Sequence, residues 1–171
     1  MKTSRWALTC IIAVALSNFG STALVAADSN RSPVAADKSA AQDVSMLERW
    51  SGDYPVAELK RLPSEQQKSS PGFIGDSKTF AAVWQAFQPD EKTPSIDFNK
   101  NLAVFSRNLD FYNRTSIARV TLKDGVVDVL AIETMSAQPI DDKVAMGLAM
   151  ISRKGVRFVR SREKLIPVSG H

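Results

Sequence analysis

An aromatic-faced helix is predicted in the middle of the chain, where four large apolar residues recur at i, i+3, i+4 and i+7. These residues are Phe80, Val83, Trp84 and Phe87. Their spacing places them on one face of a helix of about three turns. Asp76 is a favourable N-cap, because its carboxylate accepts hydrogen bonds from the first free amides, and Pro89 ends the helix. Such a stripe is more typical of a helix packed on a sheet than of an aromatic ligand platform.

Alternating polar and apolar residues after the helix predict β-strands. Thr115–Leu122 and Val126–Thr134 flank the segment Lys123-Asp124-Gly125. Asp and Gly accept the positive φ that tight turns require, so these two strands are expected to form a β-hairpin. The apolar run Leu102–Phe105 predicts a further strand before this hairpin.

Two segments before the helix are less regular. Val44, Leu47 and Trp50 are loosely helix-spaced, and Gly52 is expected to end a short helix there. Tyr54–Leu62 is compatible with a strand or with a turn or two of helix, and extended structure is favoured.

Helix and strand compete for Val144–Ser152, which is rich in Met and Ala. Lys154-Gly155 predicts a turn and the following Val156–Val159 is β-like, so a second hairpin is expected, with Val144–Ser152 as its first strand. Together these elements predict an α+β fold, in which a mostly antiparallel β-sheet carries one aromatic-faced helix on one face.

The first 27 residues have the organisation of a secretory signal peptide. Lys2 and Arg5 precede a mostly apolar core, Trp6–Phe19. Val25-Ala26-Ala27 supplies the small residues that a signal peptidase reads, so cleavage is expected after Ala27. An uncleaved N-terminal anchor is the alternative. We therefore expect a secreted or periplasmic protein of bacterial type, without a transmembrane segment once the signal is removed.

Residues 28–46 are rich in Ala, Ser and Asp and show no sustained apolar periodicity, which predicts a flexible spacer. Residues 47–168 are then expected to form a single α+β domain, a length that one hydrophobic core serves. Removal of the signal would lower the net charge from +4 to +2, because it takes Lys2 and Arg5 and no acidic residue. A nearly neutral chain gives little reason to expect a nucleic-acid partner, and none is predicted.

The sequence also excludes several classes of chemistry. Cys10 is the one cysteine and lies within the predicted signal, so the exported chain has no residue for a disulfide, a thiolate nucleophile or an iron–sulfur site. His171 is the one histidine and the last residue, which argues against a His-based triad and a His-ligated metal. No catalytic residue, metal ligand or cofactor is therefore predicted.

Carboxylates remain the alternative source of chemistry, since two acids can hydrolyse a glycosidic bond. The candidates are Asp97, Asp110, Glu133, Asp141 and Asp142. No spacing singles out two of them. Asp97 is instead expected to cap a turn or to pair with Lys100.

The loop Asn108–Arg114, between two predicted strands, is the candidate binding surface. Its candidate residues are Asp110, Phe111, Tyr112, Asn113 and Arg114. Exposed aromatic residues beside Arg are typical of protein recognition sites. The alternative is that the aromatic rings fold back and cover the end of the sheet.

The order of these elements resembles the C-terminal domain of the protease complex subunit PrcB, over roughly Phe73 to Val159. The shared features are a helix that bears Phe80 and Trp84, a short Pro-containing loop, an Asp-Phe pair followed by a basic residue, and an apolar strand. In this chain the last three read Pro94-Ser95-Ile96-Asp97-Phe98-Asn99-Lys100-Asn101-Leu102-Ala103-Val104-Phe105. After that strand, Phe111-Tyr112-Asn113-Arg114 stands in place of a Gly-Tyr pair. The resemblance implies a small exported α+β domain that is non-enzymatic and associates with other secreted proteins.

We therefore expect an exported, non-enzymatic protein-binding or assembly module whose partner is another exported protein. Two alternatives stay open. One is a small carboxylate-dependent hydrolase acting on a cell-envelope polysaccharide, which requires two carboxyl groups that converge in one cleft. The other is a small-ligand carrier, which requires an apolar cavity under the helix.

Overall fold

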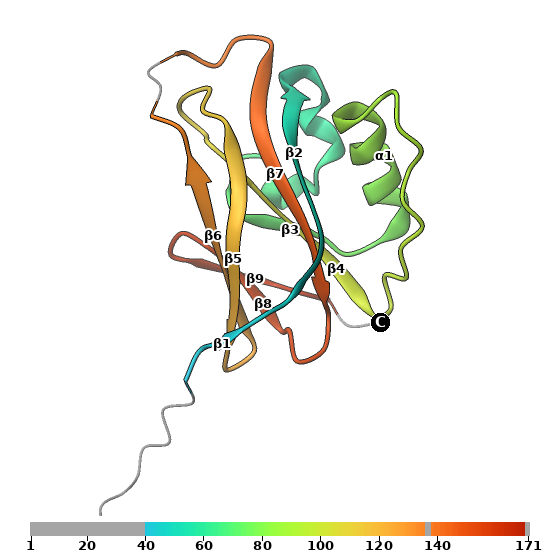
Figure 1. Cartoon of the computed structure of the whole chain (residues 1–171), viewed down its shortest axis with the longest axis vertical. Coiled ribbons are helices and arrows are strands. Elements are labelled where there is room, and N and C mark those ends of the chain that lie inside the picture. The colour runs from blue at the N-terminus through green and yellow to red at the C-terminus, as the bar shows by residue number, and fades with distance from the viewer. Residues whose placement is uncertain (1–39, 136–137, 170–171) are drawn as a thin grey trace, which may run out of the picture. The chain divides into compact units, whose positions relative to one another are not determined.

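The computed structural model describes residues 40–135 and 138–169, and these residues form three layers (Figure 1). A four-stranded sheet lies between an α-helix on one face and a five-stranded sheet on the other. The prediction of an α+β fold, with one main helix packed on a mostly antiparallel sheet structure, is confirmed.

The four-stranded sheet has the order β2-β7-β4-β3. Its strands are β2 (Met46–Pro55), β7 (Lys143–Ser152), β4 (Asn101–Arg107) and β3 (Gly72–Ile74). The five-stranded sheet has the order β1-β5-β6-β8-β9. Its strands are β1 (Gln42–Asp43), β5 (Thr115–Lys123), β6 (Val126–Glu133), β8 (Phe158–Ser161) and β9 (Lys164–Pro167). The helix is α1 (Ser77–Phe87), and two 3-10 helices, η1 (Val56–Arg61) and η2 (Ser64–Gln66), lie between β2 and β3.

The central strand β7 is buried on both faces, which explains its composition. Every residue from Val144 to Ile151 is buried. The even-numbered residues pack under α1, whereas Ala149 and Ile151 pack between the two sheets. Because both faces are covered, apolar residues run continuously along the strand instead of alternating with polar ones. The prediction of a strand here is confirmed.

Helix α1 covers the four-stranded sheet with the aromatic stripe that the sequence predicts. Asp76 is its N-cap, because the Thr79 N–H donates to Asp76 Oδ1 at 2.8 Å. The four stripe residues, Phe80, Val83, Trp84 and Phe87, are buried. The Trp84 ring stacks on Phe80 at a centroid distance of 5.7 Å and meets Trp50 of β2 edge to face at 5.0 Å. The stripe is therefore core, as expected.

Two predictions for the residues before α1 are wrong. The short helix expected around Trp50 is absent, because Met46–Pro55 is strand β2 and its residues alternate between faces. Gly52 does not end a helix. A Cβ on Gly52 would lie 3.3 Å from the Phe87 ring, so the glycine allows α1 to approach the strand. Extended structure for Tyr54–Leu62 holds only to Pro55, since Val56–Arg61 forms η1.

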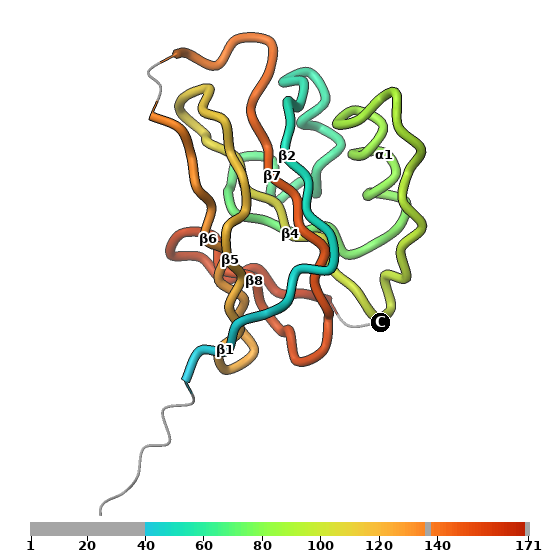
Figure 2. The backbone as a smooth tube through the Cα atoms, viewed as in Figure 1, coloured from blue at the N-terminus to red at the C-terminus, as the bar shows by residue number. Residues whose placement is uncertain are grey.

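The hairpin predicted between Val144–Ser152 and Val156–Val159 is also wrong. Strand β7 pairs with β2 and β4, whereas β8 pairs with β6 and β9 in the other sheet. The turn at Gly155, where φ is 78°, carries the chain from one sheet to the other (Figure 2). The structure does contain the predicted β5–β6 hairpin, in which Asp124 and Gly125 take positive φ values of 51° and 80°.

Order begins earlier than the expected domain boundary. Strand β1 pairs with Thr121 and Leu122 of β5, so the end of the range 28–46 expected as a spacer belongs to the five-stranded sheet. Residues 28–39 and the predicted signal, 1–27, lie outside the described residues. Among the helices that the structure describes, none has the length and apolar character needed to cross a membrane.

A row of small residues brings the two sheets into backbone contact. Gly147 of β7 lies between Ser51 of β2 and Ser106 of β4. A Cβ on Gly147 would lie 3.2 Å from the Ser116 Cα and the Ile117 N of β5. The start of β5 therefore packs directly on β7, which holds the loop before β5 close to β2.

Replacing Gly147 with alanine should destabilise the fold, because the added methyl would force two backbones apart. Overpacking of this kind costs about 1–3 kcal/mol. Gly75→Ala is the matched control, since a Cβ there would meet Phe73 and Arg153 side chains at ordinary distances of 3.5 Å or more. Urea unfolding of both variants tests this. Equal free energies of unfolding for the two variants would contradict the close approach.

Candidate binding site

The structure divides the five residues predicted as a binding surface among several environments. The segment before β5 pairs with the segment after β6, since Tyr112 N–H donates to Gln138 O and Thr134 N–H to Arg114 O, each at 3.0 Å. Successive side chains therefore point to opposite sides. Tyr112 and Arg114 line a cleft beside β2. The predicted surface is thus not continuous.

The other three predicted residues lie elsewhere. Phe111 is 47% exposed, whereas Asn113 is only 8% exposed and its Oδ1 accepts no hydrogen bond within the described residues. Asp110 lines a separate pocket of about 320 Å³, where it lies 4.0 Å from Arg162.

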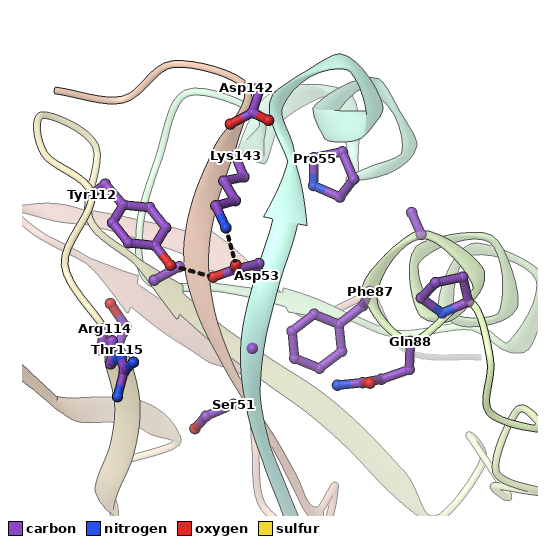
Figure 3. Close-up of a pocket in the computed structure, with 14 residues that line it drawn as sticks. Ser51, Asp53, Pro55, Phe87, Gln88, Tyr112, Arg114, Thr115, Asp142 and Lys143 are labelled. Carbon is purple, nitrogen blue, oxygen red and sulfur yellow. Dashed lines mark hydrogen bonds and ion pairs between the residues drawn. The ribbon is translucent and has the colours of Figure 1, made fainter.

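The cleft has a volume of about 740 Å³ and surrounds the edge of β2 that faces away from β7. Figure 3 places Asp53, Tyr112 and Lys143 on one side of β2, and Phe87 and Gln88 on the other. The full lining is Ser51, Gly52, Asp53, Pro55, Ala86, Phe87, Gln88, Pro89, Tyr112, Arg114, Thr115, Asp142, Lys143 and Ala145.

Three side chains form a hydrogen-bonded cluster on one side of the cleft. Asp53 of β2 accepts a bond from the Tyr112 hydroxyl at 2.6 Å and forms an ion pair with Lys143 Nζ of β7 at 2.7 Å. The Lys143 ammonium also lies 5.5 Å from the centre of the Tyr112 ring. The ring, the carboxylate and the ammonium therefore fix one another's positions.

The contacts within this cluster stabilise each of the three side chains in its ordinary protonation state near neutral pH. Partial burial raises the pKa of Asp53, but the hydrogen bonds from Lys143 and Tyr112 and the positive charges of Lys143 and Arg114 together lower it by more, so the pKa lies below its ordinary value. The bond to Asp53 raises the pKa of Lys143 and that of Tyr112. Near neutral pH the carboxylate is charged, the ammonium is charged and the phenol is neutral. None of the three is poised to gain or lose a proton.

Arg114 differs from this cluster, because its guanidinium forms no hydrogen bond or ion pair among residues 40–135 and 138–169. Both backbone polar groups of Arg114 are bonded to Thr134. The Arg114 N–H donates to Thr134 Oγ1, and the Arg114 carbonyl accepts from the Thr134 N–H. The positive charge lowers the pKa of Asp53, so it lies within electrostatic reach of the cluster. Arg114 is thus an exposed cation on an anchored backbone, free to meet an anionic group.

The five acidic residues that are candidates for hydrolysis are not all in one site. Asp97 accepts from Asn99 N–H at 3.0 Å and pairs with Lys100 at 3.3 Å, which confirms its expected role as a local anchor. Asp141 and Asp142 are exposed, and Asp142 lines the cleft beside β2. The remaining two candidates, Asp110 and Glu133, line the pocket of about 320 Å³.

The sequence indicates the loop that contains Tyr112 and Arg114, but it does not indicate the residues that Tyr112 contacts. No motif in the sequence links Asp53 or Lys143 to Tyr112. They meet because β2 and β7 pair in the register Asp53↔Ala145 and Pro55↔Lys143, which places Asp53 and Lys143 diagonally on one face of the sheet. Only the topology carries that information.

Comparisons with models of known protein families, with curated proteins and with solved structures give no match. The resemblance to the C-terminal domain of PrcB therefore stays a prediction. Within the described part of the chain, no group of three or more His, Cys, Asp or Glu side chains is placed to hold a metal ion.

Replacing Tyr112 with phenylalanine should raise the pKa of Asp53 toward its ordinary value, because the carboxylate loses one hydrogen bond. A depressed carboxyl pKa contributes stability above the ordinary value and loses it as the pH falls through the folded-state pKa. The variant should therefore lose part of this contribution at neutral pH and lose less on acidification. NMR titration of the Asp53 carboxyl tests the pKa, and an unchanged value in Tyr112→Phe would contradict the geometry.

Proposed function

We propose that the protein is an exported, non-enzymatic binding or assembly module that holds another exported protein in the cleft around β2. The observation that carries this proposal is that Arg114, an exposed guanidinium without an acceptor in the described residues, lines the same cleft as the fixed ring of Tyr112. Tyr and Arg are the residue types that contribute most binding energy at protein interfaces. The Tyr112 ring is already held by Asp53 and the Arg114 backbone by Thr134, so less conformational entropy is lost on binding than from a mobile loop.

The protonation states in the cleft favour binding over catalysis. An amine nucleophile or base has to be deprotonated, and a general acid needs a raised carboxyl pKa. The contact between Lys143 and Asp53 has the opposite effect on both groups, since it raises the pKa of the Lys143 amine and lowers the pKa of the Asp53 carboxyl. The cluster is suited to presenting fixed charges and a ring to a partner.

Export and association with secreted proteins are supported by the sequence. The signal-like organisation of residues 1–27 supports a secreted or periplasmic location. The resemblance to the C-terminal domain of PrcB implies association with other secreted proteins.

A carboxylate-dependent hydrolase is the second candidate, because Asp110 and Glu133 line one pocket. The contacts of these two carboxyl groups argue against a hydrolase. Glu133 accepts from Asn108 Nδ2 at 2.6 Å, and Asp110 lies beside the Arg162 guanidinium. Each of the two carboxyl groups therefore already has a side-chain partner within the chain.

The small-ligand carrier has less support. The space beneath α1, where such a carrier would hold its ligand, is filled by packed aromatic rings. Trp50, Phe80, Trp84 and Phe98 contact one another there at centroid distances between 5.0 and 6.5 Å.

The binding function predicts that a specific partner is captured from cell-envelope extracts by the immobilised protein and is lost on Tyr112→Ala combined with Arg114→Ala. Truncation of two such residues at an interface costs about 2 kcal/mol or more. Phe111→Ala combined with Arg162→Ala is the matched control, since it removes an exposed aromatic residue and an arginine outside the cleft. Mass spectrometry of the captured proteins is the readout. Capture of nothing specific, or equal loss in both double variants, would contradict the proposal.

A further inference from the structure

Backbone groups of β2 alternate between bonding to β7 and pointing away from it. The Val56 N–H donates to the Asp142 carbonyl at 2.8 Å, at the end of the β2–β7 ladder. In an antiparallel pair, residues that exchange hydrogen bonds with their partners alternate with residues that do not. Counting back from Val56 in the observed register, Tyr54 and Gly52 direct their N–H and C=O groups to β7.

Ser51 and Asp53 therefore direct their N–H and C=O groups to the open edge. Within the described residues, β2 pairs with β7 alone at these positions, and no backbone group of either residue bonds outside that ladder. Both residues line the cleft. The floor of the cleft is thus a row of unpaired donors and acceptors at the spacing of a β-strand.

The two walls of the cleft differ in chemistry. On the side of the five-stranded sheet stand the Tyr112 ring and the Arg114 guanidinium, and Figure 3 places Phe87 and Gln88, at the end of α1, on the other side. Ala86 of α1 and Pro89, which follows the helix, also line the cleft. Asp53 is already engaged by Lys143 and Tyr112. A strand laid along this edge would point alternate side chains toward a cationic wall and an uncharged, largely apolar wall.

Asp142, the other charged lining residue without an ion pair among the described residues, lies at a different place. Figure 3 places it toward Pro55, at the opposite end of the cleft from Arg114 and Ser51. Its negative charge therefore does not oppose an anionic group that approaches Arg114 beside Ser51.

We infer that the cleft binds an extended peptide segment of a partner protein as an added strand on β2. The segment's backbone bonds to Ser51 and Asp53, an acidic side chain pairs with Arg114, and a neighbouring apolar side chain packs against the end of α1. In such strand addition, main-chain bonds supply affinity and alternate side-chain positions supply specificity. This inference rests on the proposed function and adds to it the binding mode and the chemistry of the partner segment.

The probe is a library of random linear peptides displayed on phage and selected on the full chain. Selected peptides should carry an Asp or Glu directly beside an apolar residue. They should have no proline at the positions whose backbone N–H bonds to β2. Their binding should weaken about tenfold in Ser51→Pro, which removes one outward N–H and leaves the β7 ladder intact. Ser51→Ala is the matched control, because it keeps the N–H and removes only the hydroxyl.

Arg114→Glu is an independent variant that leaves the β2 backbone unchanged. It allows the inference to be tested even if Ser51→Pro does not fold. A second selection on Arg114→Glu should replace the acidic preference with Lys or Arg. Peptides that bind wild type and Ser51→Pro equally would overturn strand addition. A persistent acidic preference on Arg114→Glu would overturn the assigned ion pair.

The outcomes separate this inference from the proposed function. A captured envelope protein that depends on Tyr112 and Arg114 but not on the Ser51 N–H would leave the binding function standing and overturn the mode. If no peptide is selected and the chain instead self-associates in a manner that Ser51→Pro abolishes, the edge serves a second copy of the chain, and the inference is overturned.

Discussion

Burial of the four-stranded sheet on both faces is the constraint on which the rest of the structure depends. Strand β7 has no polar face, so it requires a cover on each side. The aromatic stripe of α1 supplies one cover and the inner face of the five-stranded sheet supplies the other. Burying a large apolar side chain stabilises a fold by about 1.5–3 kcal/mol, and α1 alone contributes four such residues.

The cleft around β2 is a consequence of this layering. Because β7 is central, β2 is left at the edge, with its outward backbone groups between the end of α1 and the loop before β5. The small residues around Gly147 bring β5 against the sheet, and Tyr112 and Arg114 come with it. The ion pair of Asp53 with Lys143 then fixes the Tyr112 ring. The Arg114 guanidinium is left without an acceptor among the described residues, and this is the observation behind the proposed binding function.

Local chemistry made part of this architecture predictable. The α1 stripe, the Asp76 cap and the Asp124-Gly125 turn each depend on neighbouring residues, and all three are present in the structure. The path of β7 and β8 into different sheets depends on contacts across the whole chain, so the turn at Lys154-Gly155 gave the wrong hairpin. The site follows the same rule. Tyr112 and Arg114 were predicted from their loop, whereas Asp53 and Lys143 join them through strand pairing alone.

Residue-resolved amide hydrogen exchange along β2, with and without a selected peptide, tests the central claim most directly. In the free protein, the Gly52 and Tyr54 amides should exchange slowly and the Ser51 and Asp53 amides quickly, because only the first two bond to β7. Binding should slow exchange at Ser51 and Asp53 and leave Gly52 and Tyr54 unchanged. Slow exchange of Ser51 and Asp53 in the free protein, or no change on binding, would contradict the account.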